Sequence, residues 1–224
     1  MFFDKFKKNK LENNINEENL NDIGWQAIEQ EVKRVYGIDK PYVNYAPQFP
    51  MLKWKFGGEL PLEQISIYDG GDYWLFVTFG MTELYEKEEE NVEISGYGME
   101  FTFKLKKNSS DDELELKAMS DTLQKIARYV YSGNGLIKPY QYIYSGQTHG
   151  IDLKKESKLT GFITIPDTKL NTINTPNGRV DFVELIGATD LELKSIIDKQ
   201  ITVKELYEKI GTDITDYTRN SVIK

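Results

Sequence analysis

The chain has 224 residues and a net charge of −8; 39% of its residues are hydrophobic and 12% are aromatic. This much apolar and aromatic surface is typical of a folded globular protein and excludes a disordered chain. The absence of cysteine excludes disulfides and thiolate metal sites, and is consistent with the reducing cytoplasm that we predict as the location. The negative charge disfavours a nucleic-acid-binding function, because binding to phosphates depends on basic side chains.

The first residues, MFFDKFKKNKLENNINEEN, are basic and then polar, without the apolar centre of a secretory signal. We therefore predict a flexible tail over residues 1–15, followed by a single domain over residues 16–224. A short hook that binds a membrane or a partner through Phe2, Phe3 and Phe6 is the alternative for this tail. No apolar run reaches the ~18 residues needed to cross a bilayer, so we expect no membrane-spanning segment.

The segment NDIGWQAIEQEVKRVYG, residues 21–37, predicts the first helix. Its apolar residues recur at steps of three and four and share one face: Trp25, Ile28, Val32 and Val35. Asn21 or Asp22 can cap its start, and Gly37 stands where a helix ends in the left-handed conformation. Three prolines in DKPYVNYAPQFP then favour extended or turning backbone.

A group of strands follows, in LKWKF, QISIY, YWLFVTF and MEFTFKL. YWLFVTF is apolar on both faces, which is typical of a strand in the middle of a sheet. MEFTFKL alternates between apolar and polar residues. We predict that these last two segments are neighbouring central strands and that they supply core residues: Trp74, Val77, Phe79, Phe101 and Phe103.

The second half begins with a helix in SSDDELELKAMSDTLQKIARYVYSGNG, which Gly133 stops. Its apolar stripe contains Leu116, Met119, Leu123, Ile126 and Val130. Strands follow in YQYIY, GFITI and RVDFVELI, with an Asn-Gly turn in TPNGRV. Two capping boxes then begin two C-terminal helices: Thr189 with Glu192, and Thr202 with Glu205. Because the strands are grouped, the pattern predicts an α+β fold, with a mixed or largely antiparallel sheet and flanking helices.

A block of glutamates separates the two most strand-like segments. It lacks the alternating Asp, Asn and Gly of a calcium loop. Two interpretations stay open: a solvated hairpin tip that prevents aggregation of the neighbouring strands, or a surface that attracts a basic partner.

The sequence contains no recognisable catalytic, metal or cofactor motif, so we predict no catalytic residue, no metal ligand and no cofactor. His149, the only histidine, lies in a Gly-rich loop without a second histidine or a cysteine to complete a metal site. Arg219 in TDYTRNS can bind a carboxylate or phosphate through two hydrogen bonds, or can hold the C-terminus through an internal salt bridge, the interpretation we favour.

Seven segments, in this order, resemble the suppressor of fused domain family, especially its bacterial members. They span nearly the whole chain after the tail: GWQAIEQEVKRVYG, GGELPLEQISIY, WLFVTFGMTELYEKE, SGYGMEFTFKLK, LQKIARYVYSGN, TPNGRVDFVELIGATDLEL and TDYTRNS. Three positions depart from the family pattern, in which Leu60 would be an aspartate, Leu75 a histidine and Phe76 a tyrosine. A histidine-dependent role at this strand is therefore not expected.

The resemblance implies a non-enzymatic α+β domain that binds a protein. Animal members sequester a zinc-finger transcription factor by holding an extended peptide as an added strand, and bacterial members are associated with toxin–immunity loci. We predict a cytoplasmic immunity protein with a toxin as partner, which the acidic charge suits if that toxin is basic. The alternatives are a regulatory scaffold that binds an extended peptide and an enzyme based on carboxylates or His149. The predicted partner-binding residues are Phe76, Glu86, Glu88, Glu89, Glu90 and Glu93.

Overall fold

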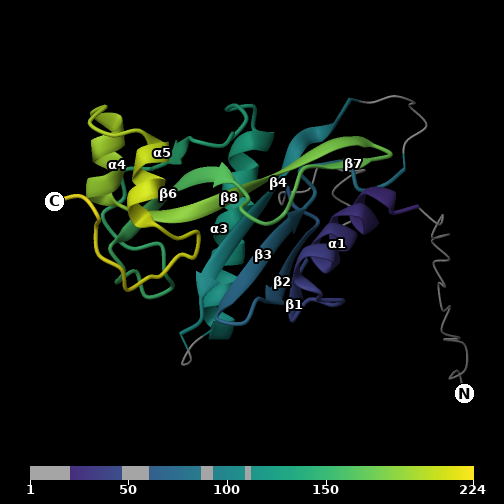
Figure 1. The fold of residues 1–224 in the computed structure, drawn as a ribbon, viewed down its shortest axis with the longest axis horizontal. Helices are drawn as coiled ribbons and strands as arrows, with labels where there is room; N and C mark the ends of the chain where they lie inside the picture. The colour runs from purple at the N-terminus through teal and green to yellow at the C-terminus, as the bar shows by residue number, and fades with distance from the viewer. Residues whose placement is uncertain (1–20, 47–60, 87–92, 109–111) are drawn as a thin grey trace, which may run out of the picture.

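The computed structural model describes residues 21–46, 61–86, 93–108 and 112–224. Figure 1 shows the helices and strands of this part of the chain. In chain order they are α1 (Ile23–Tyr36), β1 (Val43–Tyr45), β2 (Gln64–Asp69), β3 (Tyr73–Phe79), β4 (Ile94–Lys106), α3 (Asp112–Tyr131), β5 (Tyr142–Ile143), β6 (Leu159–Pro166), β7 (Ile173–Thr175), β8 (Gly178–Thr189), α4 (Asp190–Ile197) and α5 (Val203–Ile210). The predicted strand LKWKF and the predicted tail lie outside the described residues.

One mixed sheet runs through the molecule, in the order β1-β2-β3-β4-β8-β6-β5, with β7 paired to β8. Strands β4 and β8 are parallel, and the other pairs are antiparallel. The predicted α+β class is therefore confirmed, as is the predicted pairing of β3 with β4 at the centre of the sheet. The parallel pair joins a sheet half formed before α3 to a half formed after it.

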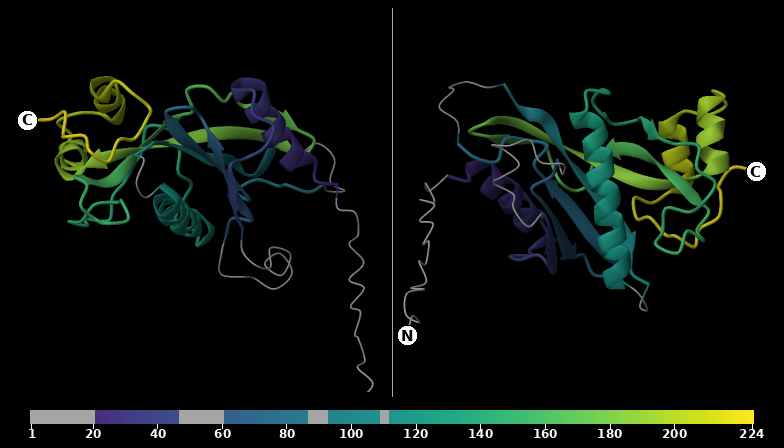
Figure 2. Two further views of the ribbon diagram at one scale, coloured as in Figure 1. Left: turned by 90° about the horizontal axis from the view of Figure 1, so that it is seen from below. Right: turned by 180° about the vertical axis from the view of Figure 1, so that it is seen from behind.

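Helices cover both faces of this sheet (Figure 2). The stripe of α3 packs on one face against Phe76, Phe101 and Phe103. On the other face α1 packs through Ile28 and Val32 against alternate residues of β3, which explains why this strand is apolar on both faces. Helices α4 and α5 cover β6 and β8. The five predicted core residues of β3 and β4 are all buried.

The predicted glycine ends and capping boxes are confirmed, but the predicted side-chain cap of α1 is not, because Asp22 stands at the N-cap without a capping hydrogen bond. Gly37 and Gly211 end α1 and α5 in the left-handed conformation. Both predicted capping boxes are present at the starts of α4 and α5. In each box the threonine hydroxyl accepts a backbone N–H, and the glutamate accepts the N–H of that threonine, so two helix donors are satisfied.

The polar face of β4 is buried rather than solvated. Lys104 is fully buried, and its ammonium lies 2.6 Å from Asp213 and 3.0 Å from Glu184. Burial lowers the pKa of Lys104, but attraction to Glu184, Asp167 and Asp213 outweighs this effect and raises it. Burial also raises the pKa of Glu184 well above its ordinary value. This ion cluster ties β4, β8 and the C-terminal segment together inside the fold.

Candidate protein-binding site

Strand β5 forms one edge of the sheet, and in the described part of the chain no further strand pairs with it. It pairs with β6 through Tyr142↔Ile163 and Ile143↔Phe162. The carbonyl of Gln141 points toward β6, where it accepts the N–H of Thr164 at 2.9 Å. Because successive residues of an antiparallel strand face alternate sides, the N–H and carbonyl of Tyr142 point away from the sheet. The edge therefore offers a backbone donor and acceptor for a further strand.

A glycine sets the close approach of β5 to β6. A Cβ atom on Gly161 would lie 2.4 Å from the carbonyl oxygen of Ile143, which is backbone and has no alternative rotamer. On the side preceding β5, the hydroxyl of Thr164 accepts the N–H of Gln141 at 3.0 Å and donates to the carbonyl of Lys138 at 2.7 Å. These contacts fix the position of a strand that is only two residues long.

Two grooves flank β5, and both are lined by Gln141 and Tyr142. The larger groove, of about 1010 Å³, lies between α3 and the loop that carries His149. Besides Tyr142, three large, exposed and apolar side chains line it: Tyr129, Leu136 and Leu153. Exposed apolar side chains that gather along one groove are typical of a surface that a partner covers.

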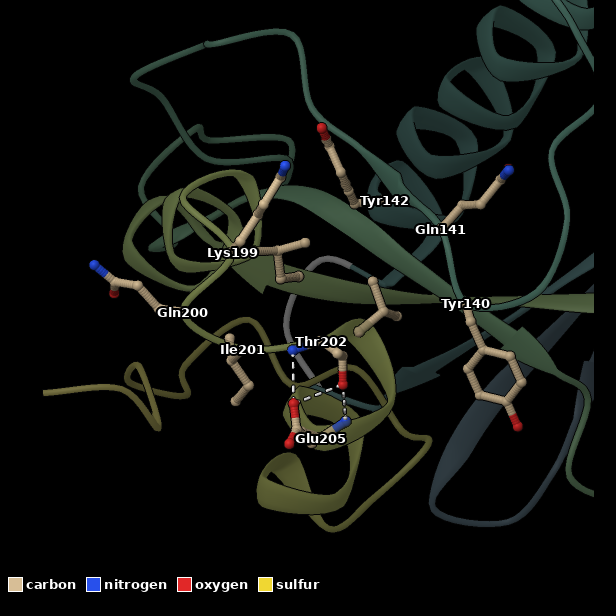
Figure 3. Close-up of a pocket in the computed structure, with 10 residues that line it drawn as sticks. Tyr140, Gln141, Tyr142, Lys199, Gln200, Ile201, Thr202 and Glu205 are labelled. Atoms are coloured by element: carbon tan, nitrogen blue, oxygen red, sulfur yellow. Dashed lines mark hydrogen bonds between the residues drawn. The ribbon is translucent and has the colours of Figure 1, made fainter.

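The smaller groove, of about 770 Å³, lies between β5 and the connection from α4 to α5 (Figure 3). Glu205 lies in this groove with its carboxylate already bonded to Thr202, whose N–H donates at 2.8 Å and whose hydroxyl donates at 2.7 Å. The side-chain ammonium of Lys199, which also lines this groove, has no hydrogen bond or ion pair with any described residue. Of the two charged groups that line this groove, Glu205 accepts hydrogen bonds, whereas the ammonium of Lys199 makes none with the described residues.

The predicted partner-binding residues lie away from β5. Glu86 is exposed beside the start of α1, where its carboxylate accepts from the side chain of Asn21 at 2.9 Å. Glu93 is exposed, and its carbonyl accepts the N–H of Arg179 at 3.1 Å, near the start of β8. The other three predicted glutamates, 88 to 90, lie outside the described residues.

Phe76 requires a correction, because it lies inside the core and not on a surface. Its side chain is fully buried, and its ring packs edge-on against Phe103 with the ring centroids 5.6 Å apart. The apolar pattern of β3 identified a buried strand, and Phe76 on that strand points toward α3. A partner would have to open the core to contact this ring.

The side chains that were considered for chemistry take structural or exposed positions. His149 is exposed in the larger groove. Arg219 holds both carboxylate oxygens of the buried Glu192 at 2.7 Å, which confirms the internal salt bridge. Within the described residues, no group of three or more histidines and carboxylates could hold a metal ion. No helix among these residues is long and apolar enough to cross a membrane.

The sequence indicated a strand in YQYIY but not its place at the edge of the sheet. Strand order depends on contacts between distant segments, which no local pattern reports. One signal was available: Gly161 lies inside the strand β6, and a glycine within a strand often marks the close approach of another backbone. For Lys199 no local signal distinguishes it from other surface lysines.

Comparison with known proteins identifies the family. The family model described as "Suppressor of fused protein (SUFU)" matches residues 58–220. The chain belongs to the suppressor of fused family. The suppressor of fused homologs of human and mouse are each 25% identical to it over 185 residues, which cover 77% of this chain and 37% of theirs. The chain thus spans less than half the length of the curated relatives it matches.

Solved suppressor of fused structures share the fold. A chain from the crystal structure of the Sufu–Fu complex superposes with a TM-score of 0.74 and 26% identity, covering 90% of this chain and 93% of that one. The crystal structure of suppressor of fused from Drosophila superposes with a TM-score of 0.72 and 27% identity, and the match covers 90% of this chain and 52% of that one. A homologue from Neisseria gonorrhoeae superposes with a TM-score of 0.58 and 15% identity, and the match covers 91% of this chain and 98% of that one. At this identity the likeness supports the fold alone.

Proposed function

We propose that this chain is a non-enzymatic protein-binding domain that holds an extended segment of its partner as a strand added to β5. The observation that carries the proposal is the edge at Tyr142, where a stretch of backbone lies between two grooves and pairs with no further strand among the described residues. In strand addition, main-chain hydrogen bonds supply affinity and pockets for alternate side chains supply specificity. The occurrence of a suppressor of fused chain in a Sufu–Fu complex supports a protein as the ligand.

For the partner's identity, we propose a toxin that the chain neutralises in the cytoplasm. The net charge of −8 and the exposed Glu86 and Glu93 support a partner with a basic surface. The alternative is a regulatory scaffold that sequesters a non-toxic protein through the same edge. The two roles differ in the partner and not in the site, so the partner distinguishes them.

A matched pair of substitutions at Tyr142 tests the binding mode. Tyr142→Pro removes the outward N–H, and proline is tolerated on edge strands because that N–H makes no ladder bond. Tyr142→Ala removes the side chain and keeps the N–H. We expect Tyr142→Pro to weaken binding at least ten-fold more than Tyr142→Ala does, with both variants melting as cooperatively as the wild type. Equal affinities would place the partner elsewhere.

The partner itself is sought among the products of neighbouring genes. Each is expressed alone and together with this chain, and growth is measured. Rescue of growth by the wild type, but not by Tyr142→Pro, is the result expected of an immunity protein that acts through β5. A neighbouring product that binds through the same edge without being toxic would favour the regulatory scaffold.

A further inference from the structure

The ends of the helices reveal an exception beside β5. Three of the four helices that the structure describes are followed by a glycine in the left-handed conformation: Gly37 after α1, Gly133 after α3 and Gly211 after α5. Helix α4 is instead followed by Lys199, with φ 58°. A residue with a Cβ is strained in this conformation, and glycine is the usual choice. The exception stands on the wall of the smaller groove.

The backbone at Lys199 and Gln200 makes the hydrogen bonds that are usual at the end of a helix. The N–H of Lys199 donates to the carbonyl of Ile196 at 2.9 Å, and the N–H of Gln200 donates to the carbonyl of Ser195 at 2.9 Å. A glycine would make the same bonds with less strain. The helix end therefore does not require a lysine side chain, apart from a modest interaction between its charge and the helix dipole.

The side chain of Lys199 is exposed and belongs to the lining of the groove. In Figure 3 it points in the same direction as the ring of Tyr142, which lies on the opposite wall. The other charged group that lines the groove, Glu205, accepts the N–H and the hydroxyl of Thr202 in its capping box and forms no ion pair with the ammonium of Lys199. A strand added to β5 would place alternate side chains over this groove, within reach of an ammonium that forms no ion pair with the described residues.

We propose that Lys199 is a specificity-determining residue that selects a carboxylate side chain in the segment added to β5. The inference rests on the proposed function and gives the partner's segment a defined chemistry. The ammonium of Lys199 is opposite in sign to the net charge of the chain, so the bound segment carries an acidic residue even when the rest of the partner is basic. Lys199 occupies a glycine position because the groove uses its charge.

Peptides test this preference without knowledge of the natural partner. A random library of displayed 12-residue peptides is selected against the wild type, and selected peptides are synthesised with Glu, Gln or Lys at the position of interest. We expect acidic residues to be enriched at one position. At 0.1 M salt the Glu peptide should bind about two- to five-fold more tightly than the Gln peptide, the range for an exposed ion pair, and this difference should fade at high salt.

Variants connect the preference to Lys199. Lys199→Gln should abolish the tighter binding of the Glu peptide, and Lys199→Arg should retain this preference. Lys204→Gln removes an equal charge from an exposed position on α5 outside the groove, and should retain it. Lys199→Gly should abolish the preference while raising Tm by roughly 2–4 °C, since it relieves the strained backbone. If Lys199 served only the helix end, Lys199→Gly would lower Tm and would leave the preference for the Glu peptide unchanged.

The outcomes separate this inference from the proposed function. If no peptide is selected, or if the selected peptides bind Tyr142→Pro as tightly as Tyr142→Ala, strand addition at β5 fails and the role of Lys199 fails with it. If the peptides depend on the Tyr142 N–H but show no acidic preference, or keep that preference in Lys199→Gln, the role of Lys199 alone is overturned. Enrichment of basic residues over the groove would also overturn it.

Discussion

At the scale of single residues, Glu100 shows how this fold uses a buried carboxylate. It is fully buried on β4, and its oxygens accept four hydrogen bonds from Thr78, Gly80 and Thr82. These bonds hold the turn after β3 against β4. Burial raises the pKa of Glu100 to about 7, although the four hydrogen bonds act to lower it. The carboxyl therefore titrates in the folded protein near neutral pH.

This titration predicts a pH dependence of stability. In the unfolded chain the pKa of Glu100 is near its ordinary value of 4.5. The folded state then binds more protons between pH 4.5 and about 7, and ionisation in this interval opposes folding. We expect the wild type to lose free energy of unfolding relative to Glu100→Gln as the pH rises from 5 to 8, measured by urea unfolding. The opposite slope would show that the four hydrogen bonds outweigh burial.

At the scale of elements, the C-terminal segment after α5, residues 212–224, contacts both β4 and the start of α4, and we call it the strap. Thr215 forms a bridge with Leu105 of β4. Farther on, Arg219 bonds to both oxygens of Glu192, which also accepts the N–H of Thr189 in the capping box of α4. Burial acts to raise the pKa of Glu192, but the hydrogen bonds from Arg219, Thr189 and Val222 outweigh it and lower the pKa. One carboxylate thus holds both the helix start and the strap.

Removal of the arginine tests the strap. Arg219→Met leaves Glu192 buried without its partner, and we expect a loss of about 3–5 kcal/mol in the free energy of unfolding at pH 7. Because the pKa of Glu192 is lowered in the folded state, this difference should be complete above pH 4.5 and should disappear as the pH falls through the folded pKa. Urea unfolding between pH 3 and 8 measures it.

The same segment supplies a control. Lys106→Met breaks an ion pair with Asp216 in which the lysine side chain is 58% exposed, and exposed pairs contribute only about 0–1 kcal/mol. An equal loss in both variants would mean that the strap responds to any change in charge and not to the buried pair.

The elements also show what the sequence can and cannot predict. Capping boxes, the glycines after helices and the stripe of α3 depend on residues a few positions apart, so a local pattern reports them. The surroundings of Phe76 and Lys104 depend on segments distant in the chain. The same limit applies to the candidate site, because the residues that line the grooves beside β5 come from α3, α4, α5 and their connecting loops.

At the scale of the whole molecule, two surfaces of different character lie apart. The exposed Glu86 and Glu93 adjoin the starts of α1 and β8. The groove with Lys199 lies between the edge strand β5 and the connection from α4 to α5. In Figure 1, α4 and α5 lie at the end of the molecule opposite to α1 and β7. A partner that contacts both would be attracted by the first surface and held at the second.

This division predicts separate effects on the rates of binding. Replacing Glu86, Glu88, Glu89, Glu90 and Glu93 by glutamine should slow association with a basic toxin about ten-fold at low salt and have little effect at high salt, because steering is screened over about 10 Å at 0.1 M. Dissociation should change less. Stopped-flow mixing with the purified partner measures both rates.

A control removes the same charge elsewhere, through amide replacements at five exposed carboxylates: Glu29, Asp72, Glu113, Glu156 and Glu208. It should slow association less than the replacement of the five glutamates. If the two variants associate equally fast, the glutamates serve only to keep the neighbouring strands from aggregating.

The parallel pairing of β4 with β8 has a consequence for how fast the chain folds. Lys104 and Glu184, which meet across this pair, are 80 positions apart in the sequence, whereas β3 and β4 are consecutive strands. Closing so long a loop costs chain entropy before the contacts across β4 and β8 can form. We therefore expect these contacts to form late and to slow folding.

Val183→Ala in β8 should accelerate unfolding with little effect on the folding rate, whereas Val77→Ala in β3 should slow folding. Chevron plots of both variants would reveal the order in which the two halves of the sheet are joined.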